Sequence, residues 1–150
     1  AADGGPDPEM VAAVGAMWAG FSEAGARVVA FADVPNPTRP AGNVLRCIAD
    51  HPDDYAACRF PRNDGTGTPA LRAAAAADPA VTFVDMNDWV CPTPSACPTV
   101  VGGVLVYRQT SHLTKTYVRS LAPILHRVLV EAGVADGPEM PLAPVGSVGS

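Results

Sequence analysis

Short apolar runs alternate with helical patterns along this chain, and this alternation restricts the fold more than any other feature. Three runs are dense in Val, Phe and Leu: RVVAFADVP at 27–35, VTFVDM at 81–86 and VLVYR at 104–108. Each is short and almost continuously apolar, which is typical of a strand buried on both faces. Because such strands need helices on both faces, the pattern predicts a parallel α/β sheet.

Helical patterns lie between and around these runs. Apolar side chains at spacings of three and four predict a helix over 8–25, and an Ala-rich segment predicts a short one over 68–78. Residues 43–51 form one or two helical turns inside a Pro-, Asp- and Gly-rich excursion. Residues 112–133 carry an apolar stripe typical of a long helix, which Pro123 should kink or interrupt.

Three strands are few for a parallel sheet, since sheets usually hold about four to six. Doubly wound domains open on a strand, whereas this chain opens on a helix. We therefore expect one or two further strands to precede residue 1. The Pro- and Gly-rich ends predict flexible segments at 1–7 and 135–150 around a folded domain of 8–134.

The charge balance excludes one class of partner. Fifteen acidic residues against ten basic ones give a net charge of −5. Such a chain offers no basic surface to release counterions from a phosphate backbone, so we expect no nucleic-acid partner. Its longest apolar runs are also far shorter than the roughly 20 residues that a membrane-spanning helix needs.

The four cysteines form two close pairs, Cys47 with Cys58 and Cys91 with Cys97. An even number in local pairs favours disulfides in an oxidising compartment, although three connectivities are possible. Two local bonds are the preferred interpretation, each worth roughly 2 to 3 kcal/mol in the loop-entropy model. Free buried thiols and a zinc site are the alternatives. For zinc, the spacing in CPTPSAC is wide and no His pair completes the site, so we expect no metal.

His112 is the best candidate for a catalytic side chain. The order VLVYR, QTS, HLT places it just past a predicted strand and at the start of the following helix. Ligands of open parallel sheets bind at this edge, and the positive end of a helix favours a neutral imidazole that can act as a general base. The alternative is a surface histidine that caps the helix. His51 and His126 are expected to be structural.

Three segments carry a resemblance to a known family. VTFVDMNDWVCP, CPTVVGGVLVYR and SHLTKTYVRSLAP resemble the C-terminal part of the SGNH hydrolase-like domain that is fused to the membrane acyltransferase-3 domain of bacterial cell-envelope O-acyltransferases. The resemblance extends over residues 8–130. It implies a three-layer α/β/α, flavodoxin-like parallel sheet, of which this chain holds only a part.

The resemblance also implies a set of catalytic residues, and the chain matches only one of them. The family uses a Ser in a Gly-Asp-Ser turn, an oxyanion hole with a Gly and an Asn, and a final Asp-x-x-His. His112 matches the His, whereas Gln109 stands at the position of the Asp. Asn87 and Asp88 imitate the oxyanion block but lack its Gly, so we interpret them as a structural turn. No Gly-Asp-Ser occurs, and the serines lack the strand-turn setting of a nucleophile: Ser22, Ser95, Ser111, Ser120, Ser147 and Ser150.

Two other residues are candidates near the site. The amide of Gln109 lacks the charge that stabilises an imidazolium, although its oxygen could still orient the ring, and some relatives manage with a Ser–His dyad. Asp85, at the end of VTFVDM, could be a substitute acid in contact with the substrate or simply a turn cap. Trp89 could stack on a sugar or pack in the core, whereas Trp18 is expected in the core.

Two functions follow from this reading. The first is an extracytoplasmic domain, periplasmic or at the cell surface, which transfers an acyl group, expected to be acetyl, to an envelope polysaccharide. His112 would be the base, the Ser would lie outside this chain, the membrane acyltransferase domain would be the partner, and no cofactor would be needed. The isolated chain is then expected to be inactive. The alternative is a catalytically inactive SGNH-like domain that binds a glycan or a protein.

Overall fold

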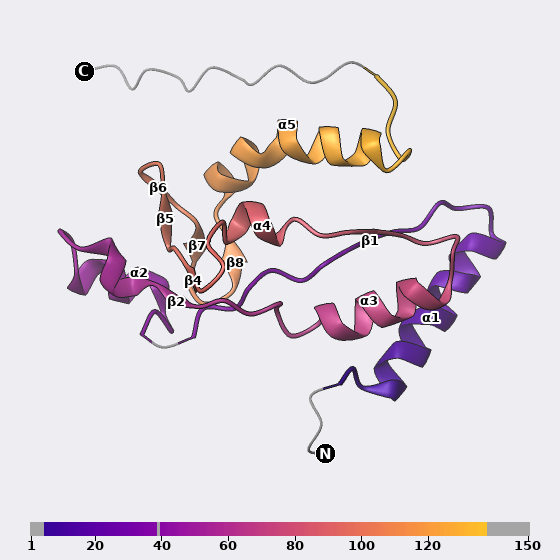
Figure 1. The fold of residues 1–150 in the computed structure, drawn as a ribbon, viewed down its shortest axis with the longest axis horizontal. Helices are drawn as coiled ribbons and strands as arrows, with labels where there is room; N and C mark the ends of the chain where they lie inside the picture. The colour runs from indigo at the N-terminus through magenta and orange to yellow at the C-terminus, as the bar shows by residue number, and fades with distance from the viewer. Residues whose placement is uncertain (1–4, 39, 138–150) are drawn as a thin grey trace.

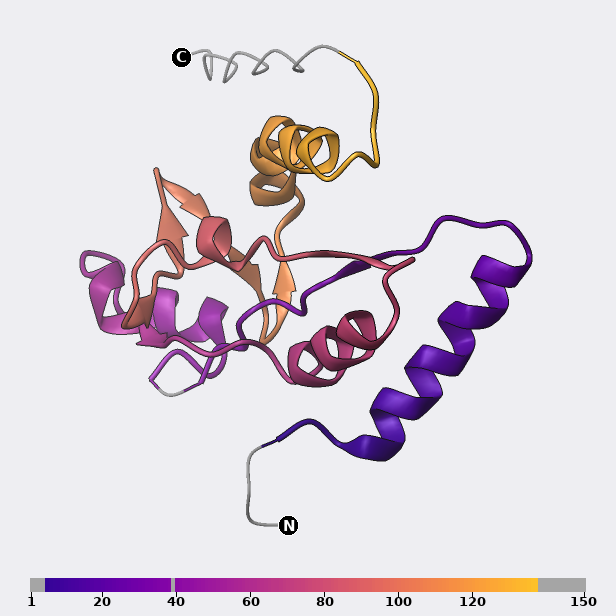
Figure 2. The ribbon, with the colours of Figure 1, turned by 45° about the vertical axis from the view of Figure 1, so that its right-hand side comes forward.

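The computed structural model describes residues 5–38 and 40–137, whose elements are arranged around two separate cores (Figures 1 and 2). Residues 1–4 and 138–150 make up most of the two ends expected to be flexible, and they lie outside the described residues.

The first core is built from two helices and a parallel strand pair. Its elements are α1 (Pro8–Glu23), β1 (Val29–Phe31), α3 (Thr68–Ala77) and β3 (Thr82–Val84). β1 and β3 pair in parallel, with Val29 opposite Thr82, and α3 contacts both strands as well as α1. Figure 1 shows α3 and α5 on opposite sides of this strand pair. The prediction of an α/β fold with a parallel sheet is confirmed to this extent: helices and strands are mixed, and one small parallel sheet of two strands is present.

Local sequence explains where α1 begins and ends. The carboxylate of Asp7 accepts a hydrogen bond from the Glu9 amide at 2.9 Å, and Pro8 occupies the first turn. The chain leaves the helix at Gly25, whose φ of +85° is readily adopted only by glycine. Trp18 points into the core, as expected, and is 6% exposed.

The second core gathers the remaining elements. Its helices are α2 (Val44–Asp50), the 3₁₀ helix η1 (Tyr55–Cys58), α4 (Asn87–Val90) and α5 (Lys115–Glu131). Its strands form three antiparallel pairs: β2 (Phe60–Pro61) with β4 (Ala96–Cys97), β5 (Val100–Val101) with β6 (Val104–Leu105), and β7 (Tyr107–Arg108) with β8 (His112–Leu113).

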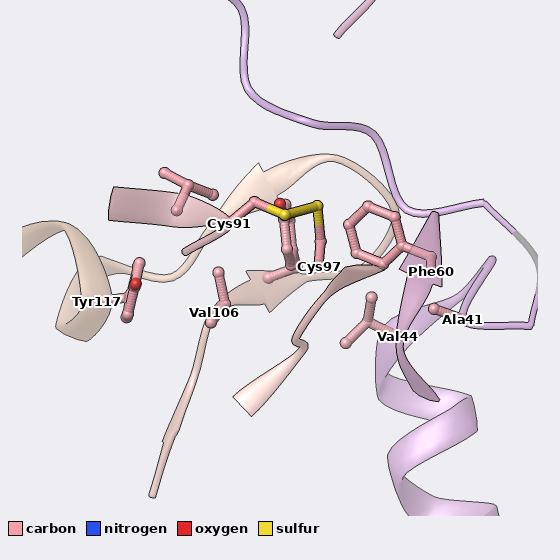
Figure 3. Packing of buried hydrophobic residues seen from close by; sticks show 9 residues of the cluster. Ala41, Val44, Phe60, Cys91, Cys97, Val106 and Tyr117 are labelled. Atoms are coloured by element: carbon pink, nitrogen blue, oxygen red, sulfur yellow. A yellow bond between two sulfur atoms is a disulfide. The ribbon is translucent and has the colours of Figure 1, made fainter. Parts of the chain in front are cut away.

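One disulfide, Cys91–Cys97, is part of this second core, and the other, Cys47–Cys58, joins α2, whose Val44 packs in the core, to η1. The structure contains the two local pairings, Cys47–Cys58 and Cys91–Cys97. Figure 3 shows the Cys91–Cys97 bond among buried side chains that come from several elements. Phe60 meets Tyr107 there edge to face, with ring centroids 5.6 Å apart. The Pro-, Asp- and Gly-rich excursion is therefore cross-linked within itself by Cys47–Cys58, and it contributes Ala41, Val44 and Phe60 to a dense hydrophobic cluster.

The expectation that VLVYR is a third parallel strand is wrong. Residues 104–108 instead contribute β6 and β7, which pair with β5 and β8 and not with β1 or β3. The chain reverses before this run because Gly102 and Gly103 both adopt positive φ. Val106 and Tyr107 are fully buried by the disulfide-containing cluster, which explains the apolar sequence without a sheet between two helix layers. Pro123 likewise does not interrupt the last helix, since α5 continues through it.

Two buried tyrosines in this cluster differ in hydrogen bonding. The Tyr117 hydroxyl donates to the Trp89 carbonyl at 2.6 Å, whereas the Tyr107 hydroxyl is buried and has no partner among the described residues. Burial, with a smaller contribution from Tyr117, raises the pKa of Tyr107 above its ordinary range. The Tyr107 hydroxyl is thus desolvated in its neutral form without a compensating bond.

This difference predicts opposite effects for the same substitution. Tyr107→Phe removes an unsatisfied hydroxyl, so the free energy of unfolding should stay constant or rise by up to about 1 kcal/mol. Tyr117→Phe leaves the Trp89 carbonyl without its donor and should lower the free energy of unfolding by about 1 to 2 kcal/mol. Urea denaturation of the two variants measures both changes, and a greater loss for Tyr107→Phe would contradict the assignment.

Candidate active site

His112 lies on the exposed face of a β-hairpin. It pairs with Arg108 across β7 and β8, while the neighbouring pair joins Tyr107 to Leu113. Since successive side chains on a strand point to opposite faces and Tyr107 is buried, His112 and Arg108 share the face turned away from the core. His112 is therefore not beyond the carboxyl end of a parallel strand, as the sequence suggests, but within the return strand of a hairpin.

The turn of this hairpin is held by a backbone contact to α2. Gln109 has a φ of +62°, a left-handed conformation that favours Gly, Asn or Asp over Gln. Its carbonyl oxygen accepts a hydrogen bond from the Val44 amide at 3.1 Å. Because Cys47, on the same helix as Val44, is bonded to Cys58, the turn beside His112 is attached to a cross-linked segment.

On its other side, β8, which carries His112, is followed by α5 after the single residue Thr114 (Figure 1). Thr114 is the N-cap: its hydroxyl accepts a hydrogen bond from the Tyr117 amide at 3.2 Å and donates to the Leu105 carbonyl. The Thr114 amide also donates to the Val106 carbonyl at 2.8 Å. These bonds fix the backbone at the first turn of α5, which begins three residues after His112.

The structure does not join the other candidates to His112. Asp85 forms an ion pair with Arg72 at 2.7 Å and accepts a hydrogen bond from the Asn87 amide at 2.9 Å. It therefore acts as a turn cap at the start of α4. Within the described residues, neither the Asp85 carboxylate nor the Gln109 amide forms a hydrogen bond with the imidazole.

The serines show a similar separation. Ser22 lies on α1, Ser95 in the Cys91–Cys97 loop, and the Ser120 hydroxyl donates to the Tyr117 carbonyl at 2.7 Å. Ser111 adjoins His112 in the hairpin turn. No described serine forms a hydrogen bond with His112, and Ser147 and Ser150 lie outside the described residues.

Trp89 is partly exposed beside a groove. Its side chain is 45% exposed, and the groove has a volume of about 400 Å³ between α4, the β5–β6 hairpin and α5. Aliphatic side chains form most of the walls, while Asp88 and Ser120 add polar groups. An exposed indole beside such a groove can stack on an apolar face of a ligand.

At the carboxyl edge of the parallel strand pair, the sequence interpretation missed one organising residue. Asp33 follows β1, and its carboxylate accepts a hydrogen bond from the Gly67 amide at 3.1 Å. Its carbonyl oxygen accepts bonds from the Thr68 hydroxyl and from the Asn87 side chain. Gly65 packs directly against the backbone of Asp33 and Val34. The Asn87 side chain that donates to Asp33 is only 3% exposed, so the hydrogen bonds at this edge are structural. An Asp two residues after a short apolar strand was the available signal.

Residues 5–38 and 40–137 contain no group of three or more His, Cys, Asp or Glu side chains arranged to hold a metal ion. No helix in this part of the chain combines the length and the apolar character needed to cross a bilayer.

Comparison with known proteins adds one finding. A family model described as "SGNH domain (fused to AT3 domains)" matches residues 2–127. The matched range includes His112 and all four cysteines. Searches of curated proteins and of solved structures gave no significant match.

Proposed function

Because this chain belongs to the family of SGNH domains fused to AT3 domains, we propose that it delivers an acyl group, most simply acetyl, to a hydroxyl of an envelope polysaccharide. The AT3 domain is the membrane acyltransferase partner within the same protein. The observation that carries the proposal is the position of His112, which is exposed and held at the start of α5 by the Thr114 cap.

The proposed reaction has two halves with His112 as the base in each. A serine hydroxyl from outside residues 1–150 attacks the acyl carbonyl carbon of the donor, and its proton passes to the imidazole. The leaving group takes that proton and departs, so the acyl group becomes an ester of the serine. The acceptor hydroxyl then gives its proton to His112 as its oxygen attacks this ester, and the proton returns to the serine oxygen.

The arrangement of elements supports a partial three-layer domain. α3 and α5 lie on opposite sides of the β1–β3 pair, where helix layers would lie in an α/β/α domain (Figure 1). Two parallel strands are too few to separate such layers alone. We propose that strands from elsewhere in the parent protein complete the sheet, with residues 8–134 as the folded portion and 1–7 and 135–150 as flexible ends.

The disulfides support a location outside the cytoplasm. All four cysteines are paired, and such bonds persist in oxidising compartments. We place the domain in the periplasm or at the cell surface, tethered by the AT3 domain. There it would meet envelope polysaccharides, and the reaction would need no cofactor.

The experiment that tests this function compares the chain with its full-length parent. The parent should hydrolyse p-nitrophenyl acetate and be labelled by a fluorophosphonate, because its serine is present. The 150-residue chain should do neither. A parent that is neither active nor labelled would remove the basis of the proposal, and chain activity that depends on one of its own serines would show that the nucleophile is misplaced.

A second candidate function, binding of a glycan or protein without catalysis, is favoured by Gln109. Here the full-length Gln109→Asp variant is informative, since Asp also tolerates the positive φ and adds the charge that stabilises an imidazolium. We expect the esterase rate to rise by at least about tenfold over the parent. Gln109→Asn is the matched control, with the same backbone tolerance and no charge. Equal rates for Asp and Asn would reject an orienting role for position 109, and no turnover in any form would favour the binding function.

A further inference from the structure

Charge is distributed very unevenly along this chain. Residues 89–130 contain no Asp or Glu but hold four of the ten basic residues: Arg108, Lys115, Arg119 and Arg127. The rest of the chain holds all fifteen acidic residues. All the formally charged side chains in the segment that carries His112 are therefore basic, although the chain as a whole is acidic.

Two of these cations lie close to His112, and a third lies one helical turn farther along α5. Arg108 is its cross-strand partner on the exposed face, and side chains opposite each other have Cβ atoms about 4.5 to 5.5 Å apart. Lys115 follows three residues later, so its Cα lies within about 11 Å. Arg119 is one helical turn beyond Lys115 and on the same face of α5. We call these three residues the cationic patch.

The cationic patch is available for a ligand. All three side chains are exposed, and none forms an ion pair or hydrogen bond with another described residue. Other basic residues are already engaged: Arg62 pairs with Asp88 and Arg72 with Asp85. Exposed cations that form no ion pair and lie beside a candidate base are suited to hold the anionic groups of a substrate.

We propose that the acceptor is an anionic polysaccharide, whose carboxylate or phosphate groups bind the cationic patch while a hydroxyl on the same polymer reaches His112. This inference rests on the proposed function for the role of the hydroxyl, but not for the binding itself. Arg108 offers the planar donor pair that matches a carboxylate or phosphate, and Lys115 and Arg119 extend the positive surface along α5.

The charge distribution favours a polymer over a membrane surface. A single glycan strand is narrow enough to contact the cationic patch alone, and acidic side chains farther away than a screening length, about 8 to 10 Å, repel it little. A bilayer presents a broad plane of negative charge. Each basic residue near it would gain about 1 kcal/mol of attraction, but the fifteen acidic side chains of the chain would be repelled by the same plane.

Binding to the 150-residue chain tests the inference without any need for catalysis. The ligands are polygalacturonate for carboxylate, poly(glycerol phosphate) for phosphate and dextran as the neutral control, measured by affinity electrophoresis and calorimetry. We expect binding to one or both anionic polymers, none to dextran, and weakening as salt rises from about 0.05 to about 0.5 M. The polymer that binds tells carboxylate from phosphate.

Two double variants test whether the cationic patch is the surface that binds the polymer. Arg108→Gln with Lys115→Gln should weaken binding by about tenfold or more. Arg46→Gln with Arg59→Gln lowers the net charge equally and alters only exposed side chains outside the cationic patch, so it should change binding less than about twofold. Equal losses in both variants, equal binding to dextran, or binding to anionic lipid vesicles but to neither anionic polymer would overturn the inference. If the cationic patch binds the polymer but the full-length parent has no esterase activity, the proposed function fails and the binding site stands.

Discussion

The full-length parent protein with His112→Ala is expected to lose about 10³-fold in kcat/KM for p-nitrophenyl acetate. A positioned general base contributes about 10² to 10⁴-fold, and a serine hydroxyl without one is a weak nucleophile at neutral pH. Labelling of the serine by a fluorophosphonate should slow in parallel, because the same proton transfer activates it. Since His112 is exposed, the free energy of unfolding should change by less than about 0.5 kcal/mol.

His51→Ala is the matched control for this experiment. His51 is also exposed, but it lies at the C-terminal end of α2 and not on the β7–β8 hairpin. We expect its kcat/KM to stay within about twofold of the parent. If His112→Ala retained parental activity, or if His51→Ala lost as much, the base would have to be sought elsewhere.

The Gly65→Ala substitution should have the largest effect on stability, a loss of about 4 kcal/mol in the free energy of unfolding. Gly65 has a φ of +72°, and an added Cβ would lie 2.5 Å from the Val34 carbonyl oxygen and 2.9 Å from the Asp33 carbonyl. Backbone atoms cannot move aside as a flexible side chain would. The clash would therefore push apart the segments joined by the hydrogen bonds of Asp33.

Gly102→Ala separates the steric clash from the conformational strain. Gly102 also has a positive φ, +56°, but an added Cβ would meet nothing within 4 Å. Only the left-handed conformation would then cost free energy, about 1 kcal/mol. Urea denaturation of the two variants measures the difference, and similar losses would show that the contact with Val34 is unimportant.

Elements with strong local patterns were predictable from the sequence. α1, α3 and α5 follow from apolar spacing and Ala content, and β1 and β3 from short Val- and Phe-rich runs. Each of these patterns lies among neighbouring residues, so it can be recognised without knowledge of any distant contact. Their ends differ from the expected ends by only a few residues.

The hairpins were missed because an apolar run does not reveal its partner. VLVYR is as apolar as a parallel strand, yet it is buried by a cross-linked cluster whose members are distant in sequence. One signal was present: the Gly102–Gly103 pair between two apolar runs is typical of a tight hairpin. The glycine pair is therefore better evidence for how these strands pair than the apolar run is.

The site was predictable in part. The proximity of His112 to the start of α5 follows from the sequence, because a helix and its preceding residues are neighbours. The bond from Val44 to the Gln109 carbonyl joins residues 65 positions apart, and no local pattern encodes it. The pairing of Asp85 with Arg72 is likewise a tertiary contact, whereas the bond by which Asp85 caps the Asn87 amide is local.

The division into two cores has a consequence for assembly of the proposed enzyme. His112 is carried by β8 in the second core, whereas β1 and β3 belong to the first core. A serine on a strand added beside β1 would therefore meet the imidazole across the boundary between the two cores. The Asn87 side chain of α4 donates a hydrogen bond to the Asp33 carbonyl at this boundary, so this one bond would help to fix the distance between the two catalytic groups.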